Sequence, residues 1–252
     1  MTLIVDEVML REPNLLVPRK KPVGPVKIDN SHTLSDGLVA YWLFNQSSRS
    51  EKDLIYRNDI LSTSSNITSG VRNGQRALLS DSSSSNCRSN NLEYTSLITD
   101  KITVFLYSDF NKPTTANFIF SQSTSPAGAY DWGLYVSSNA TPSRSFRVFL
   151  NTTSGLSSPE TVADIYVDNV PILWTFTYDG AFLSMYANNK SVITPVAKTG
   201  NINKNGASIG FDYWNSSYMN FNLYYAGILN RALSASEVES LYFDPYQFLI
   251  PA

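Results

Sequence analysis

The sequence predicts an all-β protein built as an antiparallel sandwich, and three observations lead to that prediction. Apolar and polar residues alternate over several short segments, most regularly at Trp174, Phe176 and Tyr178, which is the period of a half-buried strand. Turn pairs such as Asp179-Gly180 follow these segments, and both residue types tolerate positive φ. Aromatic residues make up 13% of the 252 residues and charged residues only 16%, a balance typical of strand-rich proteins.

The stretch 174–190 predicts a hairpin with a third strand at 191–196 returning along it. Its second strand places Leu183 and Met185 on one face and ends at a second turn pair, Asn188-Asn189. This hairpin resembles one found in the LamG-like, concanavalin A-like jelly-roll superfamily. The residues that carry the resemblance are Trp174, Tyr178, Asp179, Gly180, Leu183, Tyr186 and Asn188, whereas Asn189 replaces the usual glycine.

Further strands are expected wherever the alternation or an apolar run recurs. The segment 38–44 resembles the same family and is apolar on both faces, so we expect the arm or the C-terminus to cover its second face. Strands are also expected at 75–79, 92–94, 101–109, 117–122, 132–136, 145–151, 162–167, 207–211 and 221–227.

The C-terminal segment predicts a short helix at about 234–243. Ser234 followed by Glu237 forms a capping box, and Asp244-Pro245 ends the helix. The segment also resembles the closing signature of LamG-like proteins. The matching residues are Gly227, Ile228, Asn230, Arg231, Ala232, Leu233, Ser234, Glu237, Leu241, Tyr242 and Pro245. The resemblance covers about 36–248 and implies one jelly-roll β-sandwich domain at 36–252.

Residues 1–35 predict an extended, proline-rich arm that precedes the domain. Four prolines at positions 13, 18, 22 and 25 fix φ and remove backbone donors. We expect the arm to leave its own sandwich and bind another subunit, which is a capsid protein or a second copy of the chain. The residues expected to make this contact are Leu15, Leu16, Val17, Arg19, Lys20, Lys21, Val23 and Val26.

Charge and hydropathy argue against several classes of partner. The net charge is −2, so no overall field attracts nucleic acid or an anionic membrane. No run of 18 apolar residues predicts a membrane span, and the N-terminus does not have the pattern of a signal peptide. Cys87 is the single cysteine, which rules out an internal disulfide.

No catalytic pattern is found, and the sequence predicts a protein that is not an enzyme. Glycosidases need two carboxylates that flank the scissile bond, but the seven glutamates form no such pair on a predicted strand. The only histidine, His32, lies in the arm, away from any domain nucleophile. No cofactor is expected; a structural calcium ion would suit the fold, but no ligand pattern indicates one.

Two clusters of aromatic residues are candidates for a sugar-binding site. Aromatic rings stack on sugar rings, while aspartate or asparagine bonds the hydroxyls. The candidate residues are Tyr213, Trp214 and Tyr218 in one cluster, and Asp131 and Trp132, beside Tyr130, in the other. The alternative is that these aromatics cap the core or lie in an oligomer interface.

The arm and the family resemblance together suggest three functions. The chain resembles virion proteins of tailed bacteriophages, so the first hypothesis is a capsid decoration protein on the virion surface. It would be made in the host cytoplasm, form a homo-oligomer and bind the major capsid protein or another virion protein. The second hypothesis is a glycan-binding adhesin or a receptor-binding lectin of a tail fibre. The third is a glycan hydrolase with an unusual carboxylate pair.

Overall fold

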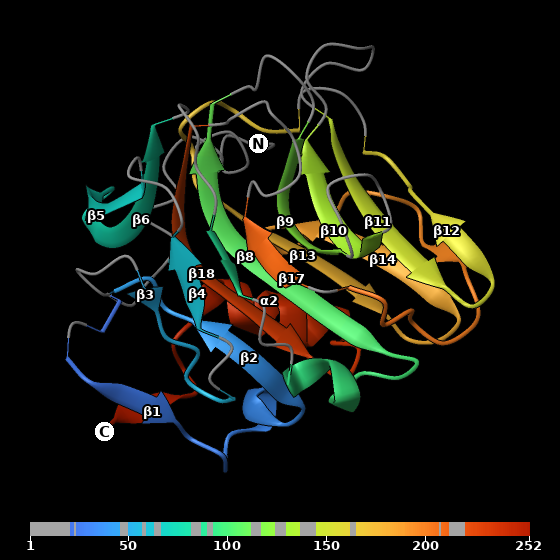
Figure 1. Ribbon diagram of the computed structural model, residues 1–252, viewed down its shortest axis with the longest axis horizontal. Helices are drawn as coiled ribbons and strands as arrows, with labels where there is room; N and C mark the ends of the chain where they lie inside the picture. The colour runs from blue at the N-terminus through green and yellow to red at the C-terminus, as the bar shows by residue number, and fades with distance from the viewer. Residues whose placement is uncertain are drawn as a thin grey trace, which may run out of the picture.

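The computed structural model describes most of the chain, and its described residues form two antiparallel sheets packed face to face. These residues are 21–22, 24–45, 50–56, 59–62, 67–81, 87–89, 93–111, 117–123, 130–136, 145–161, 165–206, 208–211 and 220–252. The all-β jelly-roll sandwich expected from the sequence is confirmed (Figure 1).

Nine described strands make up the first sheet, in the order β15-β14-β13-β8-β18-β6-β5, with β16 paired to β14 and β2 paired to β18. The bounds are β2 Leu38–Trp42, β5 Ile67–Arg72, β6 Gln75–Asp81, β8 Ile102–Phe110, β13 Ile172–Tyr178, β14 Phe182–Ala187, β15 Lys190–Ser191, β16 Val196–Ala197 and β18 Asn220–Leu229. We call this the nine-stranded sheet.

Eight described strands make up the second sheet, in the order β12-β11-β10-β9-β17-β7-β4-β3. The bounds are β3 Ser50–Glu51, β4 Ile60–Ser62, β7 Cys87–Ser89, β9 Asn117–Ser123, β10 Tyr130–Val136, β11 Phe146–Thr152, β12 Gly155–Ser157 and β17 Ser208–Phe211. We call this the eight-stranded sheet.

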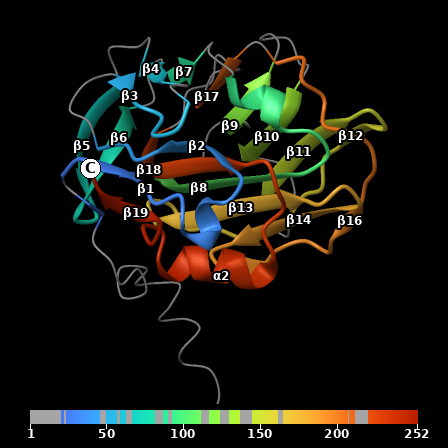
Figure 2. The same cartoon turned by 90° about the horizontal axis from the view of Figure 1, so that it is seen from below.

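A third layer covers the outer face of the nine-stranded sheet. Figure 2 shows the order of the layers, with the eight-stranded sheet at the top, the nine-stranded sheet in the middle and α2 (Ala235–Phe243) at the bottom. A two-stranded ribbon of β1 (Val26–Ile28) and β19 (Leu249–Pro251) belongs to the same layer as α2. None of the described helices is long and apolar enough to cross a membrane.

The core between the sheets contains Trp174, as expected. Its side chain is fully buried on β13, and its ring stacks on Phe146 of the opposite sheet with centroids 3.9 Å apart and an interplanar angle of 9°. Phe110 of the neighbouring strand β8 lies 6.4 Å away in a stacked orientation. Trp174 therefore contacts both sheets, and this contact joins them.

A second core lies between the nine-stranded sheet and the third layer. Tyr41 of β2 and Tyr225 of β18 face this core, and Tyr41 meets Phe248 edge-on at a centroid distance of 5.1 Å. Helix α2 contributes Val238 and Leu241. All five residues of β2 are buried, so the expected cover on both faces of this strand is confirmed.

The expected boundary of the domain at residue 35 is wrong, because residues just before it pack on the same domain. Val26 pairs with Pro251 in the β1–β19 ribbon, and Leu34 is buried in the second core. Lys21 is buried too, and its Nζ donates to three backbone carbonyls of the sandwich. Lys21 and Val26 therefore contact their own domain, contrary to the partner contact expected. The other arm residues, Leu15, Leu16, Val17, Arg19, Lys20 and Val23, lie outside the described residues.

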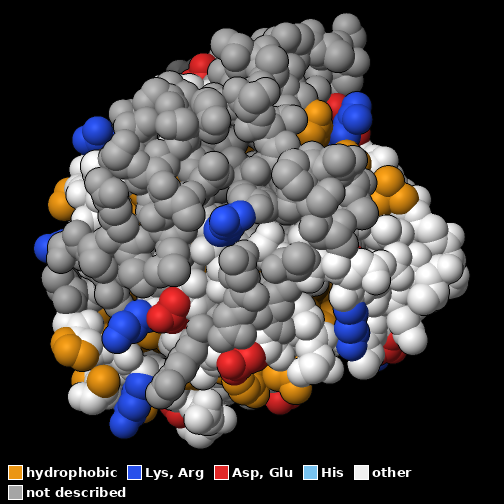
Figure 3. Space-filling model, viewed as in Figure 1, with side chains coloured by type: hydrophobic (Ala, Val, Ile, Leu, Met, Phe, Trp, Pro, Cys, Tyr) orange, Lys and Arg blue, Asp and Glu red, His pale blue; other side chains and the backbone are white. Residues whose placement is uncertain are grey.

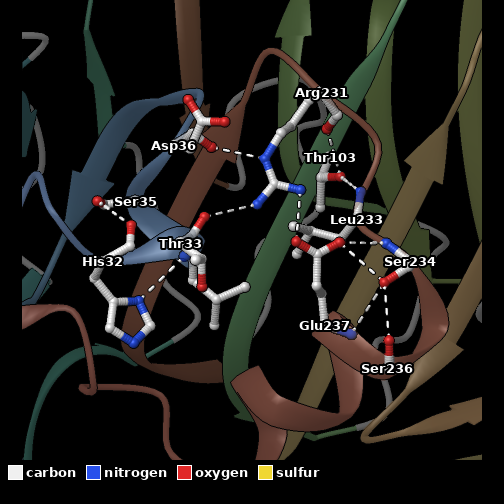
Figure 4. A network of polar contacts seen from close by, with 11 residues as sticks. His32, Thr33, Ser35, Asp36, Thr103, Arg231, Leu233, Ser234, Ser236 and Glu237 are labelled. Atoms are coloured by element: carbon white, nitrogen blue, oxygen red, sulfur yellow. Dashed lines mark hydrogen bonds and ion pairs between the residues drawn. The ribbon is translucent and has the colours of Figure 1, made fainter.

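Arg231 of the C-terminal signature ties the N-terminal turn to α2 (Figure 4). Its guanidinium donates to the carbonyl oxygens of Thr33 and Asp36 at 3.1 and 2.7 Å. It also pairs with Glu237 at 2.8 Å. Ser234 and Glu237 complete the expected capping box at the start of α2. This part of the signature thus has a structural role at the junction of the two chain ends.

Three expected strands differ from the structure. Residues 93–97 form the 3-10 helix η3 (Glu93–Leu97) where a strand was expected at 92–94. Residues 165–167, the described part of the strand expected at 162–167, have no strand pairing. The single strand expected at 191–196 is replaced by the two short strands β15 and β16. These segments lack the sustained alternation that specifies a longer strand.

The Trp174→Ala substitution should lower the free energy of unfolding by about 3–5 kcal/mol, as expected for a large aromatic side chain removed from a core. Phe182, on the adjacent strand β14, is 49% exposed and provides the matched control. Phe182→Ala should cost less than about 1 kcal/mol. Urea denaturation measures both values, and an unchanged midpoint for Trp174→Ala would contradict the buried position of this ring.

The Glu237→Gln substitution should remove the part of the free energy of unfolding that depends on the ionisation of Glu237. Burial raises the pKa of Glu237, but hydrogen bonds from Ser234 and the pairing with Arg231 outweigh it and leave the pKa below its usual value. A carboxyl whose pKa falls on folding stabilises the folded state above its unfolded pKa and loses this contribution as the pH falls through the folded pKa. Glutamine keeps a capping-box side chain but removes the charge.

Wild type should therefore exceed Glu237→Gln by about 0.5–1 kcal/mol at neutral pH, the usual value of a partly exposed ion pair, and the difference should vanish in acid. Glu239→Gln is the control, because Glu239 is exposed on the same helix. Denaturation curves from neutral to acidic pH test this, and a difference that grows in acid would contradict the assigned sign.

Candidate functional site

Two residues of the expected sugar-binding site are buried in the sandwich. Trp132 and Asp131 are each 1% exposed, so neither side chain has a face available to a sugar. Trp132 instead belongs to the core between the sheets, where it packs against Phe120 and Phe176. The expectation for these two residues is corrected, whereas Tyr213, Trp214 and Tyr218 lie outside the described residues.

Asp131 fastens a loop to the eight-stranded sheet. Its carboxylate accepts hydrogen bonds from the backbone N–H groups of Asn205 and Gly206 and from the Gln122 side chain. Burial raises the pKa of Asp131, and these donors partly oppose that rise. Gln122 in turn accepts from Tyr94 and Trp132. The network satisfies buried polar groups, which assigns Asp131 a structural role.

The hollow beside this network is too small for a sugar. It is lined by Thr95, Ile98, Gln122, Trp132, Ile202, Asn203 and Lys204, and its free volume is about 10 Å³. A cavity of this size has room for about one water molecule.

The other buried carboxylates are also held by the fold. Asp53 accepts from the backbone N–H groups of Tyr41, Ile55 and Tyr56. Asp109 accepts from Asn222 and Tyr224, both at 2.5 Å. Burial raises the pKa of Asp109, and these two hydrogen bonds act against it. Over the described part of the chain, no three His, Cys, Asp or Glu side chains are grouped so that they could hold a metal ion.

An aromatic cluster lies on the outer face of the eight-stranded sheet. Trp132, Leu134 and Val136 of β10 point into the core between the sheets, so the alternation of the strand turns Gly133 and Tyr135 outward. On β11, Phe146, Val148 and Leu150 point inward in the same way and Phe149 outward. We call the four residues Phe118, Tyr130, Tyr135 and Phe149 the outer aromatic cluster.

Phe118 is the centre of the outer aromatic cluster. Its ring centroid lies 4.1 Å from that of Tyr130, 4.9 Å from that of Tyr135 and 5.0 Å from that of Phe149. Phe118 is 3% exposed, whereas the three surrounding rings are partly exposed. A Cβ atom at Gly133 would lie only 2.6 Å from the Phe118 ring, so this glycine leaves the space that the ring occupies.

An ion pair borders the outer aromatic cluster. Arg147 and Glu160 form it with an N–O distance of 2.5 Å, and Ser145 donates to the same carboxylate. Tyr135 and Arg147 are directly opposite each other on β10 and β11, so their side chains share one face of the sheet. The ion pair therefore lies beside the ring of Tyr135.

The surface around this face carries no dominant charge in its described part. Figure 3 shows the molecule from the side of the eight-stranded sheet, where the described surface is mostly neutral and polar, with small apolar patches and charges of both signs. Such a surface suits a neutral, hydroxyl-rich ligand better than a polyanion. Partly exposed rings beside fixed polar groups are the features that a sugar site requires.

The sequence contained a signal for this site. The segments 132–136 and 145–151 were expected as strands, and their alternation assigns Trp132, Leu134 and Val136 to one face. Tyr135 and Phe149 then belong to the opposite face. Alternation alone does not predict the position of Phe118 on this face. The β9–β10 pairing shifts register between Leu134 and Tyr135, which interrupts the alternation of β9.

Comparisons with known proteins identify the fold. No protein-family model matches the chain, and no curated protein matches it. Among solved structures, it resembles a sialidase of Trypanosoma rangeli in complex with sialic acid, with 15% identity over 97% of this chain and 38% of the sialidase and a TM-score of 0.62. It also resembles domain 4 of an extracellular arabinanase of Geobacillus stearothermophilus in complex with arabinotriose. The identity is 13% over 81% of this chain and 98% of the arabinanase domain, and the TM-score is 0.61.

A third similar structure is the binding domain of botulinum neurotoxin DC in complex with rat synaptotagmin II. The identity is 14%, the match covers 83% of this chain and 52% of the toxin domain, and the TM-score is 0.65. The chain thus spans about two fifths to one half of the sialidase and toxin chains that it matches. At these identities the similarity shows a shared β-sandwich fold.

Proposed function

We propose that the protein is a glycan-binding module without catalytic activity, and that it binds through the outer aromatic cluster. The observation that carries this proposal is the group of partly exposed rings, Tyr130, Tyr135 and Phe149, around the buried Phe118. Rings held in place by a sheet lose little entropy when a ligand stacks on them. Arg147 and Glu160 supply a donor and an acceptor for hydroxyl groups beside them.

Binding without hydrolysis is supported by the hydrogen bonds and the ion pair that engage four described carboxylates. Asp53, Asp109 and Asp131 are committed to hydrogen bonds within the fold, and Glu237 pairs with Arg231. A glycosidase needs two carboxyl groups facing one bond across a ligand site. The solved structures that share the fold include two with a bound sugar, namely sialic acid and arabinotriose, which supports a sugar as the ligand here.

A second proposal is attachment to a virion through the residues before Lys21, as expected from the resemblance to virion proteins. This proposal is confined to the residues before Lys21, because Lys21 itself is buried in the domain. The arm contacts that this proposal needs are those of Leu15, Leu16, Val17, Arg19 and Lys20. The proposed partners are a capsid protein or a second copy of the chain.

The glycan proposal predicts that Tyr135→Ala and Phe149→Ala each weaken binding at least about tenfold, since the loss of about 1.4 kcal/mol lowers affinity by that factor. A glycan array identifies the ligand, and calorimetry on the best glycan measures the affinity. Phe182→Ala is the control, because Phe182 is an exposed aromatic residue on the other sheet. Unchanged binding by Tyr135→Ala would contradict the outer aromatic cluster as the site. If Trp214→Ala alone removes binding, the site lies at the loop expected from the sequence.

The virion proposal predicts that a chain shortened to 21–252 keeps the melting temperature of the full chain but no longer binds. Shortening to Ser35 would be a poor test, because it removes Lys21 and β1 from the fold. Light scattering measures self-association, and co-sedimentation with empty tailed-bacteriophage capsids measures capsid binding. If the full chain and the shortened chain behave alike in both assays, the arm is not the binding element.

A further inference from the structure

A gap in the nine-stranded sheet leaves three backbone carbonyls pointing at one place. Strand β18 pairs with β6 over Asn220–Leu223 and with β2 over Ala226–Leu229. These two partners lie on the same side of β18, since β8 occupies the other side along most of its length. Tyr224 therefore lies between the end of the pairing with β6 and the start of the pairing with β2. The pairing of β18 with β8 shifts register at the same point, between Leu223 and Tyr225.

The three carbonyls border this gap. They are those of Tyr224 on β18, of Arg76 on β6 and of Phe44, two residues after β2. Phe44 adopts a positive φ of 48°, which turns the chain away from the strand direction. Buried carbonyls need hydrogen-bond donors, and all three of these carbonyls accept from one side chain outside the sheet.

Lys21 supplies that donor. Its Nζ lies 2.6 Å from the carbonyl oxygen of Tyr224, 2.7 Å from that of Arg76 and 3.3 Å from that of Phe44. An ammonium group has three N–H donors and no acceptor, which matches three converging carbonyls. Lys21 is 6% exposed, and lysine is almost never buried to this extent without specific partners.

We propose that the gap between β2 and β6 is a binding site for a primary ammonium group, and that the chain fills it with its own Lys21. We call it the ammonium site. Its ligand class is a primary alkylammonium ion, because a cation without N–H groups cannot satisfy the three carbonyls by hydrogen bonding. The N-terminal segment is thus an intramolecular ligand that closes the gap in the sheet.

Amine labelling of the wild-type protein gives a test that requires no variant. Lys21 should react with an amine-acylating reagent at least about tenfold more slowly than Lys27, since labelling of a buried group requires local opening. Lys27 is exposed on β1, six residues later, and serves as the internal reference. Mass spectrometry of the digested protein measures both rates. Equal rates at the two lysines would overturn the proposal.

Chemical rescue tests the specificity of the site. Lys21→Ala should lower the melting temperature, and methylammonium chloride should raise it more for this variant than for wild type or for Lys27→Ala. Tetramethylammonium chloride at the same concentration has the same charge but no N–H donor, and should give no such selective gain. If both salts act equally, or if methylammonium stabilises all three proteins alike, the site does not recognise ammonium. Should Lys21→Ala fail to fold, Lys21→Met keeps most of the apolar stem, and the same comparison is made with it.

Discussion

Burial of both faces of β18 is the constraint on which the rest of the structure depends. Phe221 and Leu223 of this strand face the core between the sheets, while Tyr224 and Tyr225 face the second core. A sheet with two apolar faces must be covered by a layer on each side. The eight-stranded sheet supplies one layer. The two chain ends supply the other, through α2 and the β1–β19 ribbon.

The polar contacts at the chain ends follow from this arrangement. Arg231 holds the turn before β2 against the start of α2, and Lys21 fills the gap where β2 and β6 meet on β18. Both faces of β18, within the nine-stranded sheet, are then covered by described elements. The outer face of the eight-stranded sheet has no described helix or strand over it (Figure 2), and the partly exposed outer aromatic cluster lies there. The partial exposure of Tyr130, Tyr135 and Phe149 is the structural basis for the proposed glycan site.

Local sequence patterns predicted the elements whose signals are local. Alternation predicted β13 with Trp174 inside, and the Ser234–Glu237 pair predicted the start of α2. The roles of Lys21 and β1 could not be predicted in this way, because their partners are distant in the sequence. Lys21 donates to the carbonyl of Tyr224, 203 residues later, and β1 pairs with Leu249–Pro251 near the C-terminus. Trp132 was predicted to be a sugar-binding residue because it is adjacent in sequence to Tyr130 and Asp131, but the alternation of its strand buries it. The outer aromatic cluster joins three strands, and only their pairing shows that these rings meet.

The most direct test of the account is to observe which tyrosines respond to a ligand. Fluorine NMR of the protein labelled with fluorotyrosine can follow the two aromatic clusters at once during a glycan titration. The account predicts that the signals of Tyr130 and Tyr135 shift with the ligand, while those of Tyr41 and Tyr225 in the second core stay unchanged. Shifts confined to the second core, or no shift of Tyr130 and Tyr135 at a saturating glycan concentration, would contradict it.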